Sequence, residues 1–272
     1  MSQLVSVIMP AFNADRYISD AIESVLKQSH FAWELLIVND GSTDQTGAAI
    51  KEFQDERIIY FEQENQGVGA ARNLALKNMT GDYFCFLDAD DVYPTNSLET
   101  RLKVFARNPN LDFVDGTVQY VDDNLKPLNK CYTPSYTGDP FPMLLRLDER
   151  CLFGNTWMIK RDTNAKYSFE TDMSHAEDLF FYLTISCGKN YDFTLETILY
   201  YRQNMNSAMR NIGGLQKGYL MLFKKVQSLS GISSKEIRFL RLRLMRIIFL
   251  SQLFDAKDLF KAVEGAFKVL RS

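Results

Sequence analysis

A short apolar run at residues 83–87 ends directly in an acidic cluster, Asp88-Ala89-Asp90-Asp91. The run Tyr-Phe-Cys-Phe-Leu is typical of a buried strand, and unpaired carboxylates are too costly to bury beside it. The cluster is therefore expected to face a crevice at the carboxyl end of the strand, where open α/β sheets bind ligands. Clustered oxygen ligands suit Mg²⁺ or Mn²⁺. Taken alone, the cluster fits equally well a helix N-cap at Asp90 or Asp91.

Short apolar runs alternate with helical patterns through the first part of the chain. Strands are expected at residues 4–9, 35–38, 58–61 and 83–87, and helices at 15–28, 43–53, 68–79 and 95–108. This order predicts an α/β fold whose Rossmann-like, mostly parallel sheet carries helices on both faces. Further strands are expected at 113–121, 158–159 and 197–201, and a helix is expected from Glu177 to Ile185. Residues 122–140 are expected to be irregular, because turn-forming residues recur there.

Charge is distributed unevenly along the chain. The net charge is −3, but the residues from Gln216 onward hold 12 basic and 4 acidic side chains. From Leu215 the pattern is helical, in about three segments. The asymmetry predicts a separate basic, helical carboxyl-terminal region at 213–272.

Composition and motifs exclude several classes of protein. Four cysteines far apart in sequence are expected to be free thiols in a reducing compartment: Cys85, Cys131, Cys151 and Cys187. Neither a signal peptide nor an apolar run of membrane-spanning length is found, so we expect a soluble, cytoplasmic protein. A P-loop motif is absent. Nucleic acid is not an expected partner, because the part of the chain before the tail is acidic and contains no recognition motif.

Polar residues follow three of the expected strands. Residues 10–13 follow the first strand, 39–44 the second and 88–91 the fourth. Because the carboxyl ends of parallel strands lie at one edge of a sheet, a single ligand could contact all three segments.

These segments carry a family resemblance. The motifs stand at residues 5–13 (VSVIMPAFN), 34–44 (ELLIVNDGSTD), 65–73 (NQGVGAARN) and 87–91 (LDADD), followed by Glu177-Asp178 and Tyr200-Tyr201-Arg202. In order and spacing, residues 4–210 resemble the inverting glycosyltransferases of family 2, which have the GT-A fold. The resemblance implies a GT-A catalytic domain at 1–212, with a nucleotide-sugar half at 1–110 and an acceptor half at 111–212.

The resemblance also implies roles for residues of the nucleotide site. Asp40 is expected to hydrogen-bond the base, and Pro10, Phe12 and Asn13 are expected to line the pocket of base and ribose. Arg72 is expected near the nucleotide. A carboxylate at position 40 accepts from a base N–H, which suits uracil without excluding other bases.

Metal binding and catalysis are implied by the later motifs. Asp90 is expected to ligate Mn²⁺ or Mg²⁺, Asp88 to contact the ribose or the metal, and Asp91 to support them. Asp178 resembles the catalytic base, with Glu177 beside it. Without the resemblance, Glu177-Asp178 would be interpreted as a helix cap.

One departure from the family pattern follows the Tyr-Arg pair. The family often has a histidine shortly after that pair, and Asn204 stands there instead. A further metal ligand is therefore in doubt, and Arg202 is expected to carry more of the phosphate contact.

The resemblance implies a metal-dependent inverting glycosyltransferase of the hexosyltransferase type. The expected donor is a nucleotide-sugar, above all a UDP-sugar, and the expected acceptor is a hydroxyl of a glycan or lipid-linked glycan in bacterial surface polysaccharide synthesis. Two alternatives are a nucleotidyltransferase that makes sugar nucleotides and a non-catalytic nucleotide-binding relative.

The basic tail has two interpretations. Residues 234–250 interleave an apolar stripe with arginines. The favoured interpretation is a helix that packs on the catalytic domain and exposes its basic face. The other is peripheral attachment to the inner face of an anionic membrane. The helices could also form a homodimer.

Overall fold

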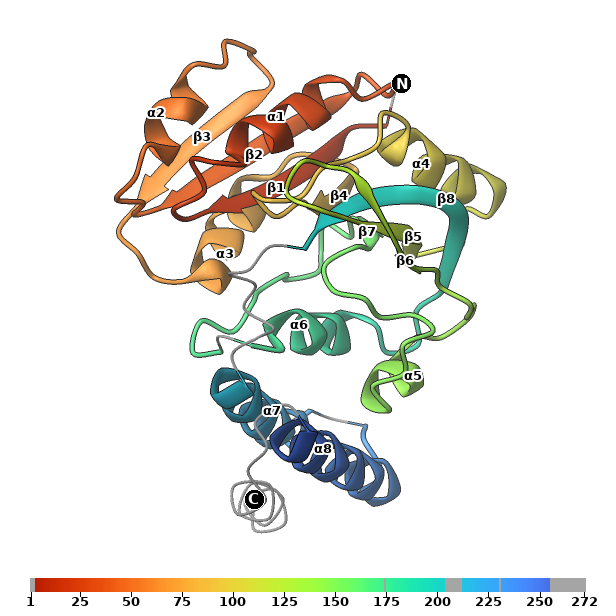
Figure 1. Ribbon diagram of the computed structural model, residues 1–272. Helices are drawn as coiled ribbons and strands as arrows, with labels where there is room; N and C mark the ends of the chain where they lie inside the picture. Colours follow the sequence, from red (N-terminus) through yellow and green to blue (C-terminus); the bar gives the residue numbers. More distant parts are fainter. Residues whose placement is uncertain (1–2, 174, 204–211, 230, 255–272) are drawn as a thin grey trace.

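A computed structural model describes residues 3–173, 175–203, 212–229 and 231–254 and contains one central sheet with helices on both sides (Figure 1). Its elements in chain order are β1 (Val5–Ala11), α1 (Ile18–Leu26), β2 (Trp33–Asp40), α2 (Thr46–Lys51), β3 (Ile58–Gln63), α3 (Val68–Asn78), β4 (Tyr83–Phe86), α4 (Ser97–Arg107), β5 (Phe113–Val121), β6 (Pro127–Tyr132), α5 (Phe141–Leu145), β7 (Met158–Lys160), α6 (Glu177–Ile185), β8 (Tyr191–Arg202), α7 (Ile212–Val226) and α8 (Ser234–Phe254).

The sheet has the strand order β3-β2-β1-β4-β7-β5-β6, and β8 pairs with β5. The pairs β3–β2, β2–β1 and β1–β4 are parallel, and β8 is parallel to β5. Antiparallel pairing occurs between β4 and β7, between β7 and β5, and between β5 and β6. The predicted α/β fold with a mostly parallel sheet is therefore confirmed.

Two hydrophobic cores lie on opposite faces of the sheet. Along β1, Val7 and Met9 pack with α1 and α4, whereas Ile8 between them packs on the other side with α3 and α6. This alternation follows from the two-residue period of a strand. The core that contains Ile8 continues outward through Leu222 of α7 and Leu244 of α8. The two basic helices therefore pack as a further layer beside α6 (Figure 1).

The sequence prediction was wrong in one segment and short in another. Residues 127–132 form β6, although 122–140 were expected to be irregular. β6 is an edge strand and mostly exposed, so its polar residues and Pro127 are tolerated there and hide the strand pattern. Strand β8 begins at Tyr191 instead of residue 197, and in this added first half only Tyr191 is fully buried.

Among the described residues, no helix is both long and apolar enough to cross a membrane. The expected basic region 213–272 contains α8 and all of α7 except its first residue, Ile212. A third helical segment would fall outside the described residues. Whether this region is a separate domain stays a prediction.

Glu34 on β2 fixes the start of β4. Its buried carboxylate accepts hydrogen bonds from Ser6 Oγ at 2.6 Å and Thr80 Oγ1 at 2.8 Å, and from the Thr80 and Gly81 backbone N–H groups at 2.5 and 3.2 Å. A carboxylate suits this place because its two oxygens accept from all four groups at once, three of them at Oε1 and Thr80 Oγ1 at Oε2.

We therefore expect Glu34→Gln to destabilise the fold. The amide oxygen can keep the three contacts of Oε1 but without the carboxylate charge, and Thr80 Oγ1 loses its acceptor at Oε2, for a cost of about 1–3 kcal/mol. Urea unfolding would measure this loss. The control is Glu62→Gln on β3, whose side chain is 59% exposed and should change stability by less than about 0.5 kcal/mol. Equal midpoints for Glu34→Gln and the wild type would contradict the prediction.

Candidate functional site

The loops after β1 and β2 are hydrogen-bonded to each other at the carboxyl edge of the sheet. Asn13, with a left-handed φ of 47°, donates its N–H to Ser42 Oγ at 3.0 Å. Its Oδ1 accepts from the Thr43 N–H at 2.8 Å. Phe12, one residue before, is 50% exposed. The structure thus brings Pro10, Phe12 and Asn13 to the edge where the sequence predicted a nucleotide pocket, and their contact with a base stays a prediction.

Asp40 lies at the end of β2 and is buried. Its Oδ1 accepts from Gln63 Nε2 at 2.7 Å and from the Gln66 N–H at 2.9 Å, and its Oδ2 accepts from the Gly67 N–H at 2.8 Å. Gly67 has a φ of 88° and directly precedes α3. Asp40 therefore positions the start of α3, a role that the sequence did not reveal. Its predicted hydrogen bond to a base would be made in addition.

Arg72 of α3 joins the acidic cluster to α6. The side chain is 4% exposed; NH2 lies 2.9 Å from Asp88 Oδ1 and NH1 lies 3.0 Å from Glu177 Oε1. Asn155 adds an amide oxygen that, turned toward Arg72, accepts from both terminal nitrogens at 3.1 and 3.0 Å. Burial disfavours the charged form, but the attraction of Asp88, Glu177 and Asp178 outweighs it and raises the pKa of Arg72.

The acidic cluster divides into exposed and buried members. The Asp88 side chain is 46% exposed and Asp90 is half-buried. Asp91 is buried, and its Oδ1 accepts from the Arg202 N–H at 2.8 Å. Burial, then the charges of Asp90 and Asp88, raise the pKa of Asp91 well above its usual range. Asp88 and Asp90 are thus the members placed to meet a ligand, and Asp91 is placed to anchor the loop.

The carboxylates of Asp88 and Asp90 are chemically suited to the predicted metal site. Within the described part of the chain, no three acidic, histidine or cysteine side chains gather to hold an ion. Magnesium commonly takes only one or two protein carboxylates and completes its shell with substrate phosphates and water. Asp90 and Asp88 therefore fit an ion that arrives with a diphosphate. Asp88 is paired with Arg72 in this structure, so such an ion would compete with the guanidinium.

Glu177 and Asp178 form the first turn of α6, directly after Ala176 in the left-handed conformation (φ 60°). Asp178 Oδ1 accepts from the Leu179 N–H at 2.7 Å. Burial, then the charge of Glu177, raises the pKa of Asp178 to about 6, although the Leu179 N–H and Arg72 act against the rise. Asp178 therefore combines a place at a helix start with the near-neutral pKa suited to a general base.

Arg202 is held by partners within the protein. It is 2% exposed; Nε donates to the Asp90 carbonyl at 2.8 Å, NH2 pairs with Asp20 Oδ2 at 2.9 Å, and NH1 donates to the Asp123 carbonyl. Arg202 thus ties the acidic loop to α1 and to the turn between β5 and β6. The predicted phosphate contact is untested. Asn204, the departure from the family pattern, lies outside the described residues.

Comparison with known proteins decides the family. Residues 6–170, more than half of the chain, match the model of glycosyl transferase family 2. The chain belongs to this family. The matched residues include Pro10, Asp40, Arg72 and the acidic cluster, whereas Asp178 and Arg202 lie beyond them.

One curated relative of this glycosyltransferase is the Escherichia coli UDP-Glc:alpha-D-GlcNAc-diphosphoundecaprenol beta-1,3-glucosyltransferase WfgD. The two are 42% identical over 122 residues, which is 44% of this chain and 48% of the relative. The chain spans less than half the length of the curated relatives that it matches first.

Solved structures show the GT-A fold. Staphylococcus aureus TarS (residues 1–349), in complex with UDP-GlcNAc, has a TM-score of 0.71 at 18% identity, covering 92% of this chain and 74% of TarS. The Pyrobaculum calidifontis mannosyltransferase PcManGT, in complex with GDP-Man and Mn²⁺, has a TM-score of 0.64 at 20% identity, covering 96% of this chain and 73% of PcManGT. At this level of identity the likeness concerns the fold alone.

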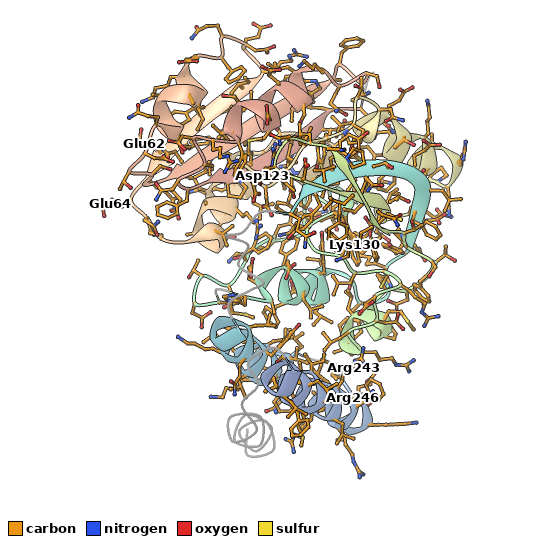
Figure 2. All side chains as sticks on the ribbon, in the orientation of Figure 1. Glu62, Glu64, Asp123, Lys130, Arg243 and Arg246 are labelled. Carbon is orange, nitrogen blue, oxygen red and sulfur yellow. The ribbon has the colours of Figure 1, made fainter. Side chains whose placement is uncertain are left out.

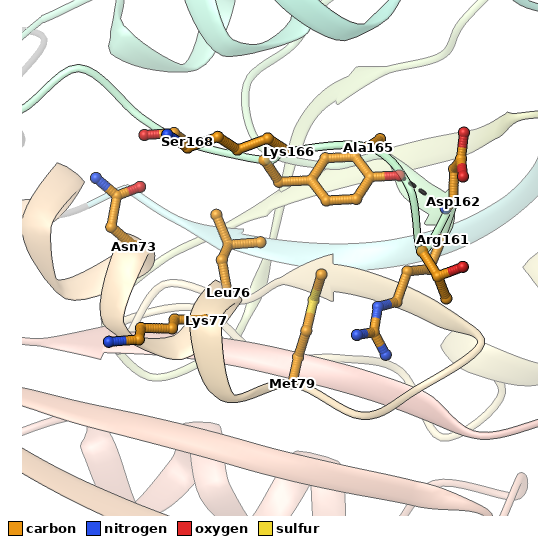
Figure 3. A pocket seen from close by; sticks show the side chains of 11 residues that line it. Asn73, Leu76, Lys77, Met79, Arg161, Asp162, Ala165, Lys166 and Ser168 are labelled. Carbon is orange, nitrogen blue, oxygen red and sulfur yellow. Dashed lines mark hydrogen bonds between the residues drawn. The ribbon is translucent and has the colours of Figure 1, made fainter.

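Some contacts of the site had no signal in the sequence. Asn155 lies on a loop outside every motif, and Asp123 lies in a turn 79 residues from its partner Arg202. A pocket elsewhere, between α3 and the segment 161–168, is lined by Leu76, Met79 and Arg161 among others (Figure 3). It lies toward the amino end of β4, where the Arg161 N–H bonds the Asp82 carbonyl, and so it is separate from the acidic cluster.

The raised pKa of Asp178 predicts a pH-dependent gain in stability for Asp178→Asn. In the folded protein this pKa is about 6, above the value of about 3.9 expected for an unfolded aspartate. Ionisation therefore lowers wild-type stability as pH rises through about 6, while below about pH 4 nothing is lost. Asparagine keeps the acceptor for the Leu179 N–H and removes the charge.

We expect Asp178→Asn to be more stable than the wild type at pH 8 by about 1–2 kcal/mol. At pH 4 the two proteins should be equal, because wild-type Asp178 is then mostly protonated. Thermal unfolding at both pH values measures the difference. Asp162→Asn, an exposed turn residue, is the control and should show no such pH dependence. A gain of the same size at both pH values would contradict the electrostatic origin.

Proposed function

We propose that this family-2 glycosyltransferase is metal-dependent and inverting, and that it transfers a hexose from a UDP-sugar to a hydroxyl of a surface glycan. One observation carries the proposal: Arg72 holds Asp88, of the expected metal loop, and Glu177, beside the expected base, against one guanidinium. The expected metal loop and the expected base are therefore adjacent. Donor names among the similar proteins, UDP-Glc and UDP-GlcNAc, support uracil as the base.

The residues divide the work of an inverting transfer. Asp178 takes the proton of the acceptor hydroxyl as that oxygen attacks the anomeric carbon from the face opposite the nucleotide. Asp40, Pro10, Phe12 and Asn13 hold the base and ribose. Asp90 and Asp88 would hold Mn²⁺ or Mg²⁺, which supplies Lewis-acid neutralisation of the departing diphosphate. Arg72 holds the carboxylates of Asp88 and Glu177 close to each other through its two ion pairs.

The proposal is tested by separating donor binding from transfer. Calorimetry with UDP-sugars, with and without Mn²⁺, should show metal-dependent binding that Asp90→Ala abolishes. Asp178→Asn should bind the donor as the wild type does and lose transfer by a factor of about 10²–10⁴, as expected for removal of a general base. The control is Glu23→Ala, a half-exposed carboxylate on α1 with no part in the site.

The outcomes separate the alternatives. Release of UDP during transfer supports the glycosyltransferase, whereas release of pyrophosphate would indicate nucleotidyl transfer. Donor binding without transfer by the wild type, and equal behaviour of Asp178→Asn, would indicate a non-catalytic nucleotide-binding relative. Absence of UDP-sugar binding by folded wild type would overturn the assignment of Asp88 and Asp90.

We further propose a peripheral position at the cytoplasmic face of the membrane, where a lipid-linked glycan acceptor would be reached. On α8, Phe239 and Leu242 are 48% and 56% exposed, and Arg238 and Arg246 of the same helix are also exposed. Arg246 is labelled in Figure 2. Exposed apolar side chains among arginines are typical of helices that lie in an anionic interface. A homodimer through the same helices is the competing proposal.

Flotation with liposomes tests the membrane contact. The wild type should float with vesicles that contain phosphatidylglycerol and not with phosphatidylcholine alone. The double variant Arg238→Glu and Arg246→Glu should lose flotation, since each basic residue near an anionic surface contributes about 1 kcal/mol. Lys27→Glu with Lys103→Glu changes the same charge on α1 and α4 and should float normally. Light scattering distinguishes the dimer, and failure of the wild type to float would reject the membrane proposal.

A further inference from the structure

An aromatic pair stands at the same edge of the sheet as the acidic cluster. β5 is parallel to β8, and two antiparallel steps through β7 make β5 parallel to β4 as well. The carboxyl end of β8 lies against the acidic loop, because Val92 forms a bridge with Tyr200 and the Arg202 N–H binds Asp91. Tyr120 near the end of β5 is in register with Tyr201 near the end of β8, and their ring centroids are 5.3 Å apart.

Two more rings join this edge-to-face pair in one aromatic cluster, and Phe153 meets both of its rings edge-to-face as well. Phe153 contacts Tyr120 and Tyr201 with centroid distances of 5.7 and 5.2 Å. Tyr132 of β6 lies 5.3 Å from Phe153 in a tilted arrangement. All four side chains are half-buried. These residues, Tyr120, Tyr132, Phe153 and Tyr201, are called the aromatic platform below.

One end of the platform leads to the expected base. Gly154 follows Phe153, and a Cβ atom on Gly154 would lie 3.7 Å from Asp178 Oδ2. Asn155, the next residue, lies against Arg72. Gly154 is thus the residue next to the carboxylate of Asp178. Consecutive Cα atoms are about 3.8 Å apart, so the backbone of Phe153 lies one residue further away.

The other end of the platform leads to the acidic loop. Tyr201 directly precedes Arg202, whose Nε donates to the Asp90 carbonyl at 2.8 Å. Asp123, in the turn that joins the platform strands β5 and β6, pairs with Arg16 and accepts from Tyr17 near the nucleotide edge. The platform thus lies between the base and the loop expected to hold the donor diphosphate. An acceptor hydroxyl must lie between the same two places in an inverting transfer.

The ring of Tyr120 presents a face to positively polarised groups. The exposed Lys130 of β6 places its Nζ 3.9 Å from the centroid of that ring (Figure 2). The negative face of an aromatic ring attracts cations and, by the same quadrupole, the polarised C–H bonds of a ligand. One face of a pyranose ring consists of such C–H bonds, while its rim carries hydroxyls to which a displaced lysine can donate.

We propose that the aromatic platform is the acceptor subsite and that it binds a pyranose ring of the acceptor glycan by stacking, with Lys130 donating to a hydroxyl of that sugar. This inference rests on the proposed glycosyl transfer, because it takes the place of Asp178 as the base to define where the acceptor lies. It gives the acceptor half of the chain, 111–212, a binding surface built from β5, β6, β8 and the loop at Phe153.

Saturation-transfer NMR with simple sugars tests the platform. The probes are the methyl β-glycosides of glucose, galactose and N-acetylglucosamine, each with and without UDP and Mn²⁺. At least one probe should receive saturation at the C–H protons of one ring face. Phe153→Leu keeps the apolar volume and removes the ring, and Tyr120→Ala removes another; each should weaken probe binding about tenfold. Tyr120→Phe should bind as the wild type does.

The controls separate this inference from the proposed function. Phe31→Ala removes an aromatic ring that is 76% exposed and precedes β2 at the opposite edge, and it should leave probe binding unchanged. UDP binding, measured on the same variants, should also be unchanged. Loss of probe binding in Phe153→Leu with intact UDP binding supports the platform. Absence of saturation for every probe, or equal binding by wild type and Phe153→Leu, overturns it. Failure of the wild type to bind UDP refutes the donor site instead, whether or not the probes bind.

Discussion

The buried guanidinium of Arg72 is the interaction on which the rest of the site depends. A charge at this depth is tolerated only with partners, and Asp88 and Glu177 supply them from two elements that are 89 residues apart in the chain. Asp40 determines where α3 begins and so where Arg72 stands. Without Arg72, the carboxylates of Asp88 and Glu177 would repel each other with no positive charge between them. The arginine therefore makes it possible for both to lie in one site.

Arg202 performs a parallel task on the other side of the acidic loop. Its backbone N–H binds Asp91, and its Nε binds the carbonyl of Asp90. The loop is therefore held between two buried arginines, one that contacts a carboxylate and one that contacts backbone. Such support fixes the backbone of the loop that carries Asp90, which favours ligand binding without reorganisation.

The chemistry and the stability of the site oppose each other at Asp178. Burial beside Glu177 raises its pKa to about 6, and this suits proton transfer near neutral pH. The same burial makes the ionised form unfavourable for folding. Gly154 lies beside this carboxylate and directly follows Phe153, whose ring we assign to the acceptor. Active-site geometry of this kind is retained at a cost in stability.

The sequence by itself determined the alternation of strands and helices, the meeting of three strand ends at one edge and the family motifs, because burial and turn chemistry leave local periodic patterns. It could not predict β6, whose edge position tolerates polar residues, nor the internal partners of Arg202, nor Asn155 beside Arg72. The aromatic platform also emerged only from the fold, since its rings come from three strands and a loop. Local patterns report whether a side chain is buried. Which side chains meet across long chain separations is decided by strand register and loop paths, and these are fixed only when the whole core packs.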